Sequence, residues 1–331
     1  MRKLIGNIQL MMECCVLYYE EDRNQNEIAD LLKISRPTVS KLLQEAKKMG
    51  MVKITLEDPM EKEYRDLEEM LVRKLNLEKV ILVGDRIGEE EQRKEVAKNA
   101  ARHLSEILND GDIVGVSMGR SVKGMIPYVD RGASKKIDFV PLLGGAPWDD
   151  SQNDANTVLT QLAQAYQAKA NPLVAPAYIK DKKMREEFLN TPEALRTIPL
   201  IRKANVALVG IGIPLEEGST LRSTGFFTPK HFDEMREKRA VGNICLQCYD
   251  IQGKENSFLC NKNVFGLKLS SIKKIPQVIG TAHRADQAAA VIGAARGGFI
   301  KTLVLNYSSA IAISDMLNTA LDKNSKRIKE K

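Results

Sequence analysis

The chain has 331 residues, enough for about two domains at roughly 100–200 residues each. Its composition, 43% hydrophobic and 28% charged, excludes a disordered or fibrous protein. The net charge of +7 is small, so the placement of charge matters more than the total. Five cysteines are too few for a disulfide framework in such a chain and favour a reducing cytoplasm. No apolar run reaches the ~18 residues of a membrane span, and the N-terminal segment lacks the apolar core of a signal peptide. We therefore expect a cytoplasmic protein that has no membrane partner.

Residues 1–57 are expected to form a DNA-binding domain built on a helix-turn-helix. Asn24 stands three residues before Glu27, a capping arrangement that predicts the start of a helix. After a short turn, Ser35 is the expected N-cap of a second helix, and Pro37 suits its first turn. Both helices have apolar or small residues at helical spacing, namely Ile28, Ala29, Leu31, Leu32, Val39, Leu42, Leu43 and Ala46. Two short helices joined this tightly are typical of the motif whose second helix enters the major groove.

The charge of this region also indicates DNA binding. Residues 31–56 carry a local charge of +5, with Glu45 as the single acidic residue, and phosphate binding needs such a basic stretch. Arg36 is suited to reading guanine, while Thr38 and Ser40 can reach bases or phosphates. The alternating pattern of Met51–Leu56 predicts a wing beside the DNA. The residues expected to contact DNA are Gln25, Arg36, Pro37, Thr38, Ser40, Lys41, Lys47, Lys48 and Lys53. The alternative is an ordinary helical hairpin with solvated lysines.

Residues 58–78 are expected to form one connector helix, with Asp58 as its N-cap and Pro59 at its first position. An apolar stripe on this helix consists of Leu67, Met70, Leu71 and Leu75. A single recognition helix reads only a half-site, so we expect at least a dimer, and this stripe is a candidate for its interface.

From residue 79 to 320 the sequence predicts an α/β domain with a mostly parallel sheet. Six β-rich runs alternate with helical stretches, at 79–85, 112–117, 138–145, 206–212, 278–282 and 302–306. The remaining residues, 321–331, form a basic tail that is expected to be disordered.

Seven segments in order resemble the SorC-type bacterial transcriptional regulators, also grouped as the DeoR/SorC sugar-responsive regulators. They are YYEEDRNQNEIADLLKISRPTVSKLLQEAKKMGMVKI, GDIVGVSMGRSV, VPLLGG, DANTVLTQLAQAY, LVAPA, VGNICLQCYDIQGK and IPQVIGTAHRADQAAAVIGAARGGFIKTLV. The resemblance spans nearly the whole chain. It implies an N-terminal domain that binds operator DNA and a C-terminal effector domain that resembles sugar-phosphate isomerases in fold. It further implies a phosphorylated sugar as effector, assembly as homodimers or homotetramers, and a role in regulating carbohydrate metabolism.

The residues of the effector domain indicate an anion site. A strand at 112–117 runs into a turn at Gly119 and then a helix, an arrangement that favours anions. Arg120 and Ser121 add a guanidinium and a hydroxyl that suit phosphate, although an ordinary structural turn is the alternative. Other residues at or after strand ends are expected to complete the pocket: Ser117, Gly144, Gly145, Asp154, Asn156, Thr157 and Gly212. For Asp154 and Asn156, capping of the next helix is a strong alternative.

Two departures from the family pattern lie beside the expected pocket. His283 and Arg284 stand where family members commonly carry small residues, and we expect both to contact the effector. Leu305-Asn306-Tyr307 replaces the frequent Thr-Asp-Glu of the family. These departures leave the identity of the effector open.

No enzymatic activity, metal or cofactor is expected. Cys245 and Cys248 lie in a strand-like segment, where residues three apart point to opposite faces, and no second pair completes a zinc site. The alternative function is a sugar-phosphate isomerase-like enzyme with an appended DNA-binding domain. It would need a positioned base, for which Asp154 and Asp250 are candidates, but no acid/base pair follows from their spacing.

Overall fold

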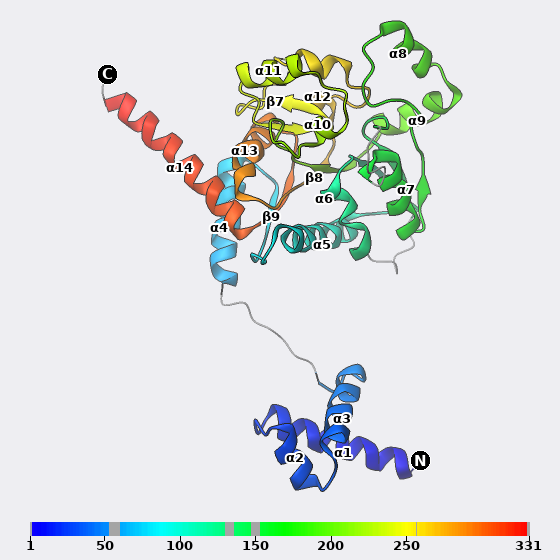
Figure 1. The fold of residues 1–331 in the computed structure, drawn as a ribbon, viewed down its shortest axis with the longest axis vertical. Coiled ribbons are helices and arrows are strands. Elements are labelled where there is room, and N and C mark those ends of the chain that lie inside the picture. The colour runs from blue at the N-terminus through cyan, green and yellow to red at the C-terminus, as the bar shows by residue number, and fades with distance from the viewer. Residues whose placement is uncertain (1, 53–59, 130–135, 147–152, 256, 330–331) are drawn as a thin grey trace. The chain divides into compact units, whose positions relative to one another are not determined.

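The computed structural model describes residues 2–52, 60–129, 136–146, 153–255 and 257–329 (Figure 1). The chain divides into two compact units, Met1–Glu61 and Lys62–Lys331. The division falls at the first residues of helix α4 (Glu61–Leu75), so the helix expected as a separate connector lies almost entirely within the larger unit.

Over residues 2–52 the small unit forms the helices α1 (Arg2–Tyr19), α2 (Gln25–Leu32) and α3 (Arg36–Lys48). Its core is formed by small and apolar side chains of all three, namely Met11, Cys14, Cys15, Ile28, Ala29, Val39, Leu42, Leu43 and Ala46. Leu31, expected on the apolar face, is instead 58% exposed. Of the predicted wing, Met51 and Val52 are not in a strand, and residues 53–57 lie outside the described part of the chain.

The large unit is built on a seven-stranded sheet of order β1-β9-β8-β5-β2-β3-β4, and its neighbouring strands are all parallel. The strands are β1 (Lys79–Val83), β2 (Ile113–Val116), β3 (Asp138–Pro141), β4 (Lys169–Ala170), β5 (Val206–Gly210), β8 (Gln277–Ala282) and β9 (Thr302–Asn306). This confirms the predicted α/β class with a mostly parallel sheet. β3 is shorter than predicted because Leu143 and Gly145 leave the sheet and form isolated bridges with Gly266 and Pro176.

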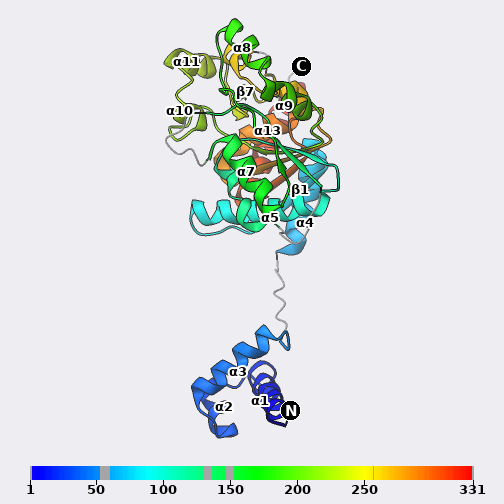
Figure 2. The same ribbon diagram turned by 90° about the vertical axis from the view of Figure 1, so that its right-hand side faces the viewer.

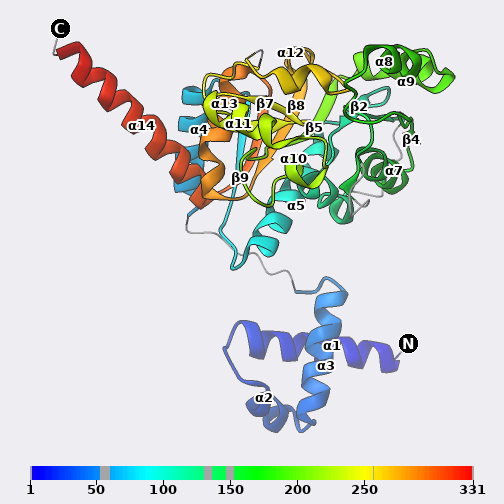
Figure 3. The same ribbon diagram turned by 45° about the horizontal axis from the view of Figure 1, so that its top comes forward.

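Helices cover both faces of this sheet (Figures 2 and 3). Alternate residues of β5 divide between two cores: Val206 and Leu208 pack with α5 and α7, and Ala207 and Val209 pack with the opposite layer. The longer helices are α5 (Glu89–Ile107), α7 (Ala155–Ala165), α8 (Lys182–Leu189), α9 (Pro192–Arg202), α11 (Pro229–Glu237), α13 (Ala288–Gly297) and α14 (Tyr307–Lys329). The short ones are α6 (Arg120–Lys123), α10 (Thr220–Ser223), α12 (Leu269–Ile272) and the 3-10 turns η1 (Ile126–Tyr128), η3 (Leu259–Asn263) and η4 (Ala285–Gln287).

The segment around Cys245 and Cys248 is not the single strand that its pattern suggests. β6 (Gly242–Ile244) and β7 (Gln247–Tyr249) pair antiparallel, and the turn between them is Cys245-Leu246, with φ of 49° and 60°. Two-residue turns with both φ positive usually contain Asn and Gly, so neither residue signals this hairpin in the sequence.

Two helices at the ends of the large unit differ from the expectation. In α4, Leu71 and Leu75 are fully buried against the sheet domain, and Leu67 and Met70 pack on the same core. Half of the stripe offered as a dimer interface is therefore buried within the chain itself, and Leu67 and Met70 are half-buried. At the other end, α14 continues to Lys329, so residues 321–329 of the predicted disordered tail are helical.

Candidate functional site

Side-chain caps shape the helix-turn-helix of the small unit. The Asn24 side chain accepts a hydrogen bond from the N–H of Glu27 at 3.1 Å, and the Glu27 carboxylate accepts one from the N–H of Asn24 at 3.0 Å. Lys33 ends α2 in the left-handed conformation (φ 51°), and Ser35 then caps α3 by accepting from the N–H of Thr38 at 3.3 Å. A three-residue link thus separates α2 from α3, as the motif requires.

The start of α3 presents polar side chains to solvent. The predicted DNA-contacting residues Arg36, Pro37, Thr38, Lys41, Lys47 and Lys48 are exposed, Gln25 and Ser40 are half-buried, and Lys53 lies outside the described residues. Arg36 and Lys41 have no ion-pair or hydrogen-bond partner within the described part of the chain. Lys47 differs, because its ammonium lies 5.7 Å from the ring centroid of Tyr19.

A pocket opens in the large unit where β2, β5 and β8 end. Its cavity volume is about 100 Å³, and it is open to solvent. Its walls come from the segments that follow these strands, from the start of α5 and from the β6–β7 hairpin. Parallel sheets bind ligands at the carboxyl ends of their strands, so this is the expected place for a ligand.

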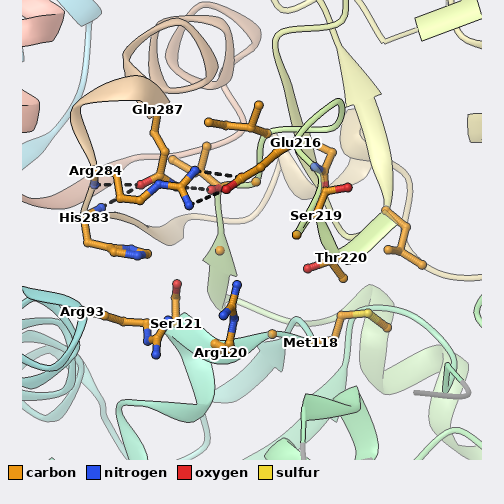
Figure 4. Close-up of a pocket in the computed structure, with 18 of the residues that line it drawn as sticks. Arg93, Met118, Arg120, Ser121, Glu216, Ser219, Thr220, His283, Arg284 and Gln287 are labelled. Atoms are coloured by element: carbon orange, nitrogen blue, oxygen red, sulfur yellow. Dashed lines mark hydrogen bonds and ion pairs between the residues drawn. The ribbon is translucent and has the colours of Figure 1, made fainter. Parts of the chain in front are cut away.

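One wall carries positive charge and hydrogen-bond donors. Figure 4 shows Arg93, Arg120 and Ser121 on the same side of the pocket. Arg120 is exposed, and the described residues provide no partner for its guanidinium or for the Ser121 hydroxyl. Arg93 is ion-paired with Glu90, yet burial and the nearby Arg120 lower its pKa. Two guanidiniums this close favour an anion between them.

The glycine turn of this wall differs in part from the expected anion cradle. Gly119 has φ of 119°, a conformation that L side chains rarely adopt. Its N–H does not face the pocket as a free donor, because it binds the carbonyl of Asn153 at 3.0 Å. The side chains of Arg93, Arg120 and Ser121 also line this wall and carry hydrogen-bond donors.

The opposite wall is held together by an ion pair. The guanidinium of Arg284 donates two hydrogen bonds to the carboxylate of Glu216, at 2.7 and 2.8 Å, and a third to Asp286 at 3.0 Å. Gln287 fixes the same turn, since its side chain accepts from the N–H of His283 at 2.9 Å and donates to the carbonyl of Ile211 at 2.6 Å. The Arg284 charge is thus already neutralised, whereas the described residues provide no partner for Arg120.

Two buried polar atoms of the pocket have no hydrogen-bond partner among the described residues: Nδ2 of Asn243 and Nε2 of His283. Buried polar groups are normally satisfied, so unpaired ones on a pocket wall point to a polar ligand. The pKa of His283 is lowered to about 4, chiefly by burial and then by Arg93, with Glu89 opposing the shift. Its imidazole is therefore neutral at neutral pH.

Six predicted effector residues line this pocket, namely Gly119, Arg120, Ser121, Gly212, His283 and Arg284. Ser117 lies beneath it, fully buried, and its hydroxyl accepts from the N–H of Gly210 at 3.3 Å. That bond ties β2 to β5 at the pocket floor.

The other predicted effector residues are not part of the described lining: Gly144, Gly145, Asp154, Asn156 and Thr157. Asp154 caps α7, accepting from the N–H of Asn156 at 2.9 Å. The Asn156 side chain bonds both backbone groups of Leu173. At Gly144 an added Cβ would meet the carbonyl oxygen of Ala175 at 2.4 Å, which explains this glycine by close packing. The capping alternative therefore accounts for the hydrogen bonds of Asp154 and Asn156.

Comparison with known proteins identifies the family. The family model described as "Putative sugar-binding domain" matches residues 61–314. The chain is 28% identical to the sorbitol operon regulator of Klebsiella pneumoniae over 311 residues, covering 92% of this chain and 97% of the relative. Over 309 residues it is 28% identical to the deoxyribonucleoside regulator of Bacillus subtilis (strain 168), with the same coverage of 92% and 97%. The crystal structure of full-length SorC from K. pneumoniae matches with a TM-score of 0.76 at 26% identity, over 92% of this chain and 98% of SorC.

The chain belongs to the SorC-type transcriptional regulators. The match extends over both units of the chain, which confirms the predicted combination of a small helical domain with an α/β sugar-binding domain. The relatives named above are both named as regulators.

Several pocket residues of this SorC-type regulator were missed by the sequence analysis: Glu89, Arg93, Glu216, Ser219, Thr220, Asn243 and Gln287. Glu216 follows β5 by six residues, so a search for polar residues after each strand would have found it. Asn243 lies in the hairpin that the sequence did not reveal. Arg93 lies within the charged helix α5, where nothing distinguishes it from its neighbours.

The regulator shows little that suits metal or acid–base chemistry within the described residues. No group of three or more His, Cys, Asp or Glu side chains is close enough to hold a metal there. Burial raises the pKa of the Cys245 thiol to about 12, so this pocket residue is not a thiolate. The candidate base Asp250 accepts hydrogen bonds from the N–H groups of Gln252 and Lys254, both at 2.9 Å, and is not in the described lining. None of the described helices is long and apolar enough to cross a membrane.

Proposed function

We propose that this SorC-type regulator binds operator DNA through α3 and that a phosphorylated sugar, held in the pocket of the large unit, modulates this binding. One observation carries the effector proposal. Among the described residues, neither the guanidinium of Arg120 nor the hydroxyl of Ser121 has a partner, and both line the same wall as the guanidinium of Arg93, at the carboxyl ends of parallel strands. A phosphate dianion is the ligand class that relieves this repulsion and satisfies these donors.

The opposite wall suits the hydroxyls of a sugar. Glu216 offers a carboxylate that is partly engaged by Arg284, while Asn243 offers an unpaired donor. Ser219 and Thr220 also line this part of the pocket. Carboxylates and amides placed at fixed positions recognise polyols by hydrogen bonding. One end of the pocket therefore suits an anionic group of the ligand, and the other end suits the hydroxyls of a sugar.

For DNA binding, the support is the exposed start of α3. Arg36 and Lys41 have no described partner, and the caps on either side hold the two helices in the required geometry. We propose that Arg36 reads a base edge and that Lys41 contacts phosphate. We also propose a homodimer or homotetramer, since operator half-sites are normally read by symmetric assemblies.

The test uses the full chain with duplex DNA selected from a random library, followed by fluorescence anisotropy with a panel of sugar phosphates and the matching free sugars. We expect sugar phosphates, but not the free sugars, to change the affinity for the selected DNA. Equal effects of both series would contradict the phosphate assignment. If no duplex is enriched, the DNA-binding proposal fails. Following the same sugar phosphates by NMR tests the enzyme alternative, which predicts a product where the regulator shows only binding.

A further inference from the structure

His283 is a buried titratable side chain on the pocket wall, and its Nε2 has no hydrogen-bond partner among the described residues. Its side chain is 9% exposed, and its Nε2 lies 3.6 Å from the nearest carboxylate oxygen, on Glu89, beyond hydrogen-bond distance. The backbone N–H groups of His283 and Arg284 both donate to Gln287, at 2.9 and 3.0 Å. The imidazole is thus held in place by its backbone while Nε2 stays unsatisfied.

The charges that face this imidazole come from every element around it. From α5 come Glu89 and Arg93, and from its own turn comes Arg284 with its partners Glu216 and Asp286. Figure 4 shows Arg93 and Ser121 across the pocket from the imidazole, with Arg120 on the same wall. A second hollow that His283 also lines contains Asp85 and Arg86. Most of these charges are paired, and Arg120 is a cation among them for which the described part of the chain provides no partner.

This environment disfavours the imidazolium form until an anion arrives. Burial is the largest cause of the lowered pKa of His283, and the guanidiniums of Arg93 and Arg284 add to it. An anionic group bound beside Arg120 and Ser121 would introduce negative charge opposite the imidazole. Opposite charge within about 4–6 Å raises the pKa of a cationic acid by about 1–3 units.

We propose that His283 takes up one proton from solvent when an anionic group binds between the two walls, and that the imidazolium then donates a hydrogen bond to that group. This inference rests on the proposed effector site. It restricts the effector class further, to ligands with a dianionic end such as a phosphoryl group, because a neutral sugar would leave the imidazole uncharged. Effector binding is then linked to pH and is tighter in mildly acidic conditions.

Sulfate is the probe that tests this proposal, since it is a dianion that does not titrate near neutral pH. Sulfate is titrated into the full chain by calorimetry at pH 5.5 and pH 8, at constant ionic strength set with sodium chloride. If binding restores the ordinary pKa of about 6.5, sulfate affinity rises about tenfold from pH 8 to pH 5.5. In His283→Gln, which keeps a polar group but cannot take up a proton, we expect affinity at pH 8 to remain and the extra gain at pH 5.5 to disappear.

His231→Gln serves as the matched control, because it removes another histidine whose ring caps α11 and does not line the pocket. It should keep the pH dependence of the wild type. NMR spectra of ¹³C-labelled histidine, assigned with the two variants, report protonation directly, and the His283 signal should move to the imidazolium position when sulfate is added at pH 6. Sulfate binding that is independent of pH, with a neutral His283 in the complex, would overturn this inference and leave the anion site intact. A chain that binds no sulfate, or binds it equally well after Arg120→Ala, would overturn both the inference and the proposed effector site.

Discussion

The substitution Arg120→Ala should weaken effector binding without lowering stability, because Arg120 has no ion-pair or hydrogen-bond partner among the described residues. The side chain is exposed, and its main recorded electrostatic effect is to lower the pKa of Arg93, which is a repulsion between like charges. Removing it should leave the free energy of unfolding within about 0.5 kcal/mol of the wild type. By contrast, each charge-assisted hydrogen bond to a bound phosphate is worth about 1.5–3 kcal/mol. Loss of one such bond weakens binding by roughly 10- to 150-fold.

The assay combines calorimetric titration of inorganic phosphate or an active sugar phosphate with thermal unfolding. Lys123→Ala is the matched control, since it removes the same charge from the same short helix α6 at a residue that does not line the pocket. Lys123→Ala should bind almost as well as the wild type, so that a general loss of positive charge is distinguished from loss of a ligand contact. Arg284→Ala is expected to lower stability, in contrast to Arg120→Ala, because it breaks a bidentate ion pair and leaves the carboxylates of Glu216 and Asp286 without their cation.

We expect Arg284→Ala to lower stability by about 1–2 kcal/mol, a value reduced from that of a buried pair because Glu216 is about one-third exposed. For a unit of this size the melting temperature falls by roughly 2–4 °C per kcal/mol. An Arg120→Ala protein with wild-type affinity would refute the assignment of the phosphate to this wall. An Arg120→Ala protein that unfolds as readily as Arg284→Ala would refute the conclusion that Arg120 is unpaired.

Three further predictions concern DNA binding, capping and pH. Arg36→Ala should weaken the free energy of operator binding by about 1–3 kcal/mol and relax specificity at one base. Lys41→Ala should reduce the dependence of log affinity on log salt concentration by about one unit. Both are measured by fluorescence anisotropy over a salt series, and wild-type behaviour of both variants would reject this placement of α3. Asn24→Ala removes one side of the capping box and should destabilise the small unit by about 1 kcal/mol. Chemical unfolding measures this effect, and an unchanged midpoint denaturant concentration would show that the cap is dispensable. His283 is neutral when folded and has an ordinary pKa when unfolded, so it contributes stability above about pH 6.5 that is lost as the pH falls towards 4. Over that pH range the free energy of unfolding of the wild type should therefore fall by on the order of 2 kcal/mol more than that of His283→Gln. Curves of stability against pH that run parallel for the two proteins would contradict the lowered pKa.

The helix-turn-helix could be read directly from the sequence because its determinants are local. The bonds between Asn24 and Glu27, and between Ser35 and Thr38, span three residues each. The apolar spacing of α2 and α3 likewise predicts which side chains enter the core, with Leu31 as the exception. Interactions within one turn of helix need no knowledge of the remaining chain.

The parallel sheet was predicted as a class, but its strand order was not. Buried apolar runs separated by helices indicate parallel strands, and the order β1-β9-β8-β5-β2-β3-β4 depends on which helices pack on which face. That order brings together the ends of β2, β5 and β8, where the pocket lies. Arg120 and Ser121 were predicted because they follow a strand directly, whereas Asp154 and Asn156 carried two interpretations that the sequence could not separate.

What the sequence by itself determined is therefore the local chemistry: the helix caps, the two helices of the helix-turn-helix, the basic α3 surface and the arginine and serine after β2. Only the tertiary structure decided which distant residues meet. Arg284 and Glu216 are 68 residues apart in the chain and share two hydrogen bonds, and Asn243 reaches the pocket from a hairpin whose turn, Cys245-Leu246, has no turn-forming residue. It also decided that Arg284 is paired, that Arg120 has no partner among the described residues, and that the His283 side chain is only 9% exposed. The physical reason is that pairing and burial depend on the non-local packing of strands and helices, which no short segment encodes on its own.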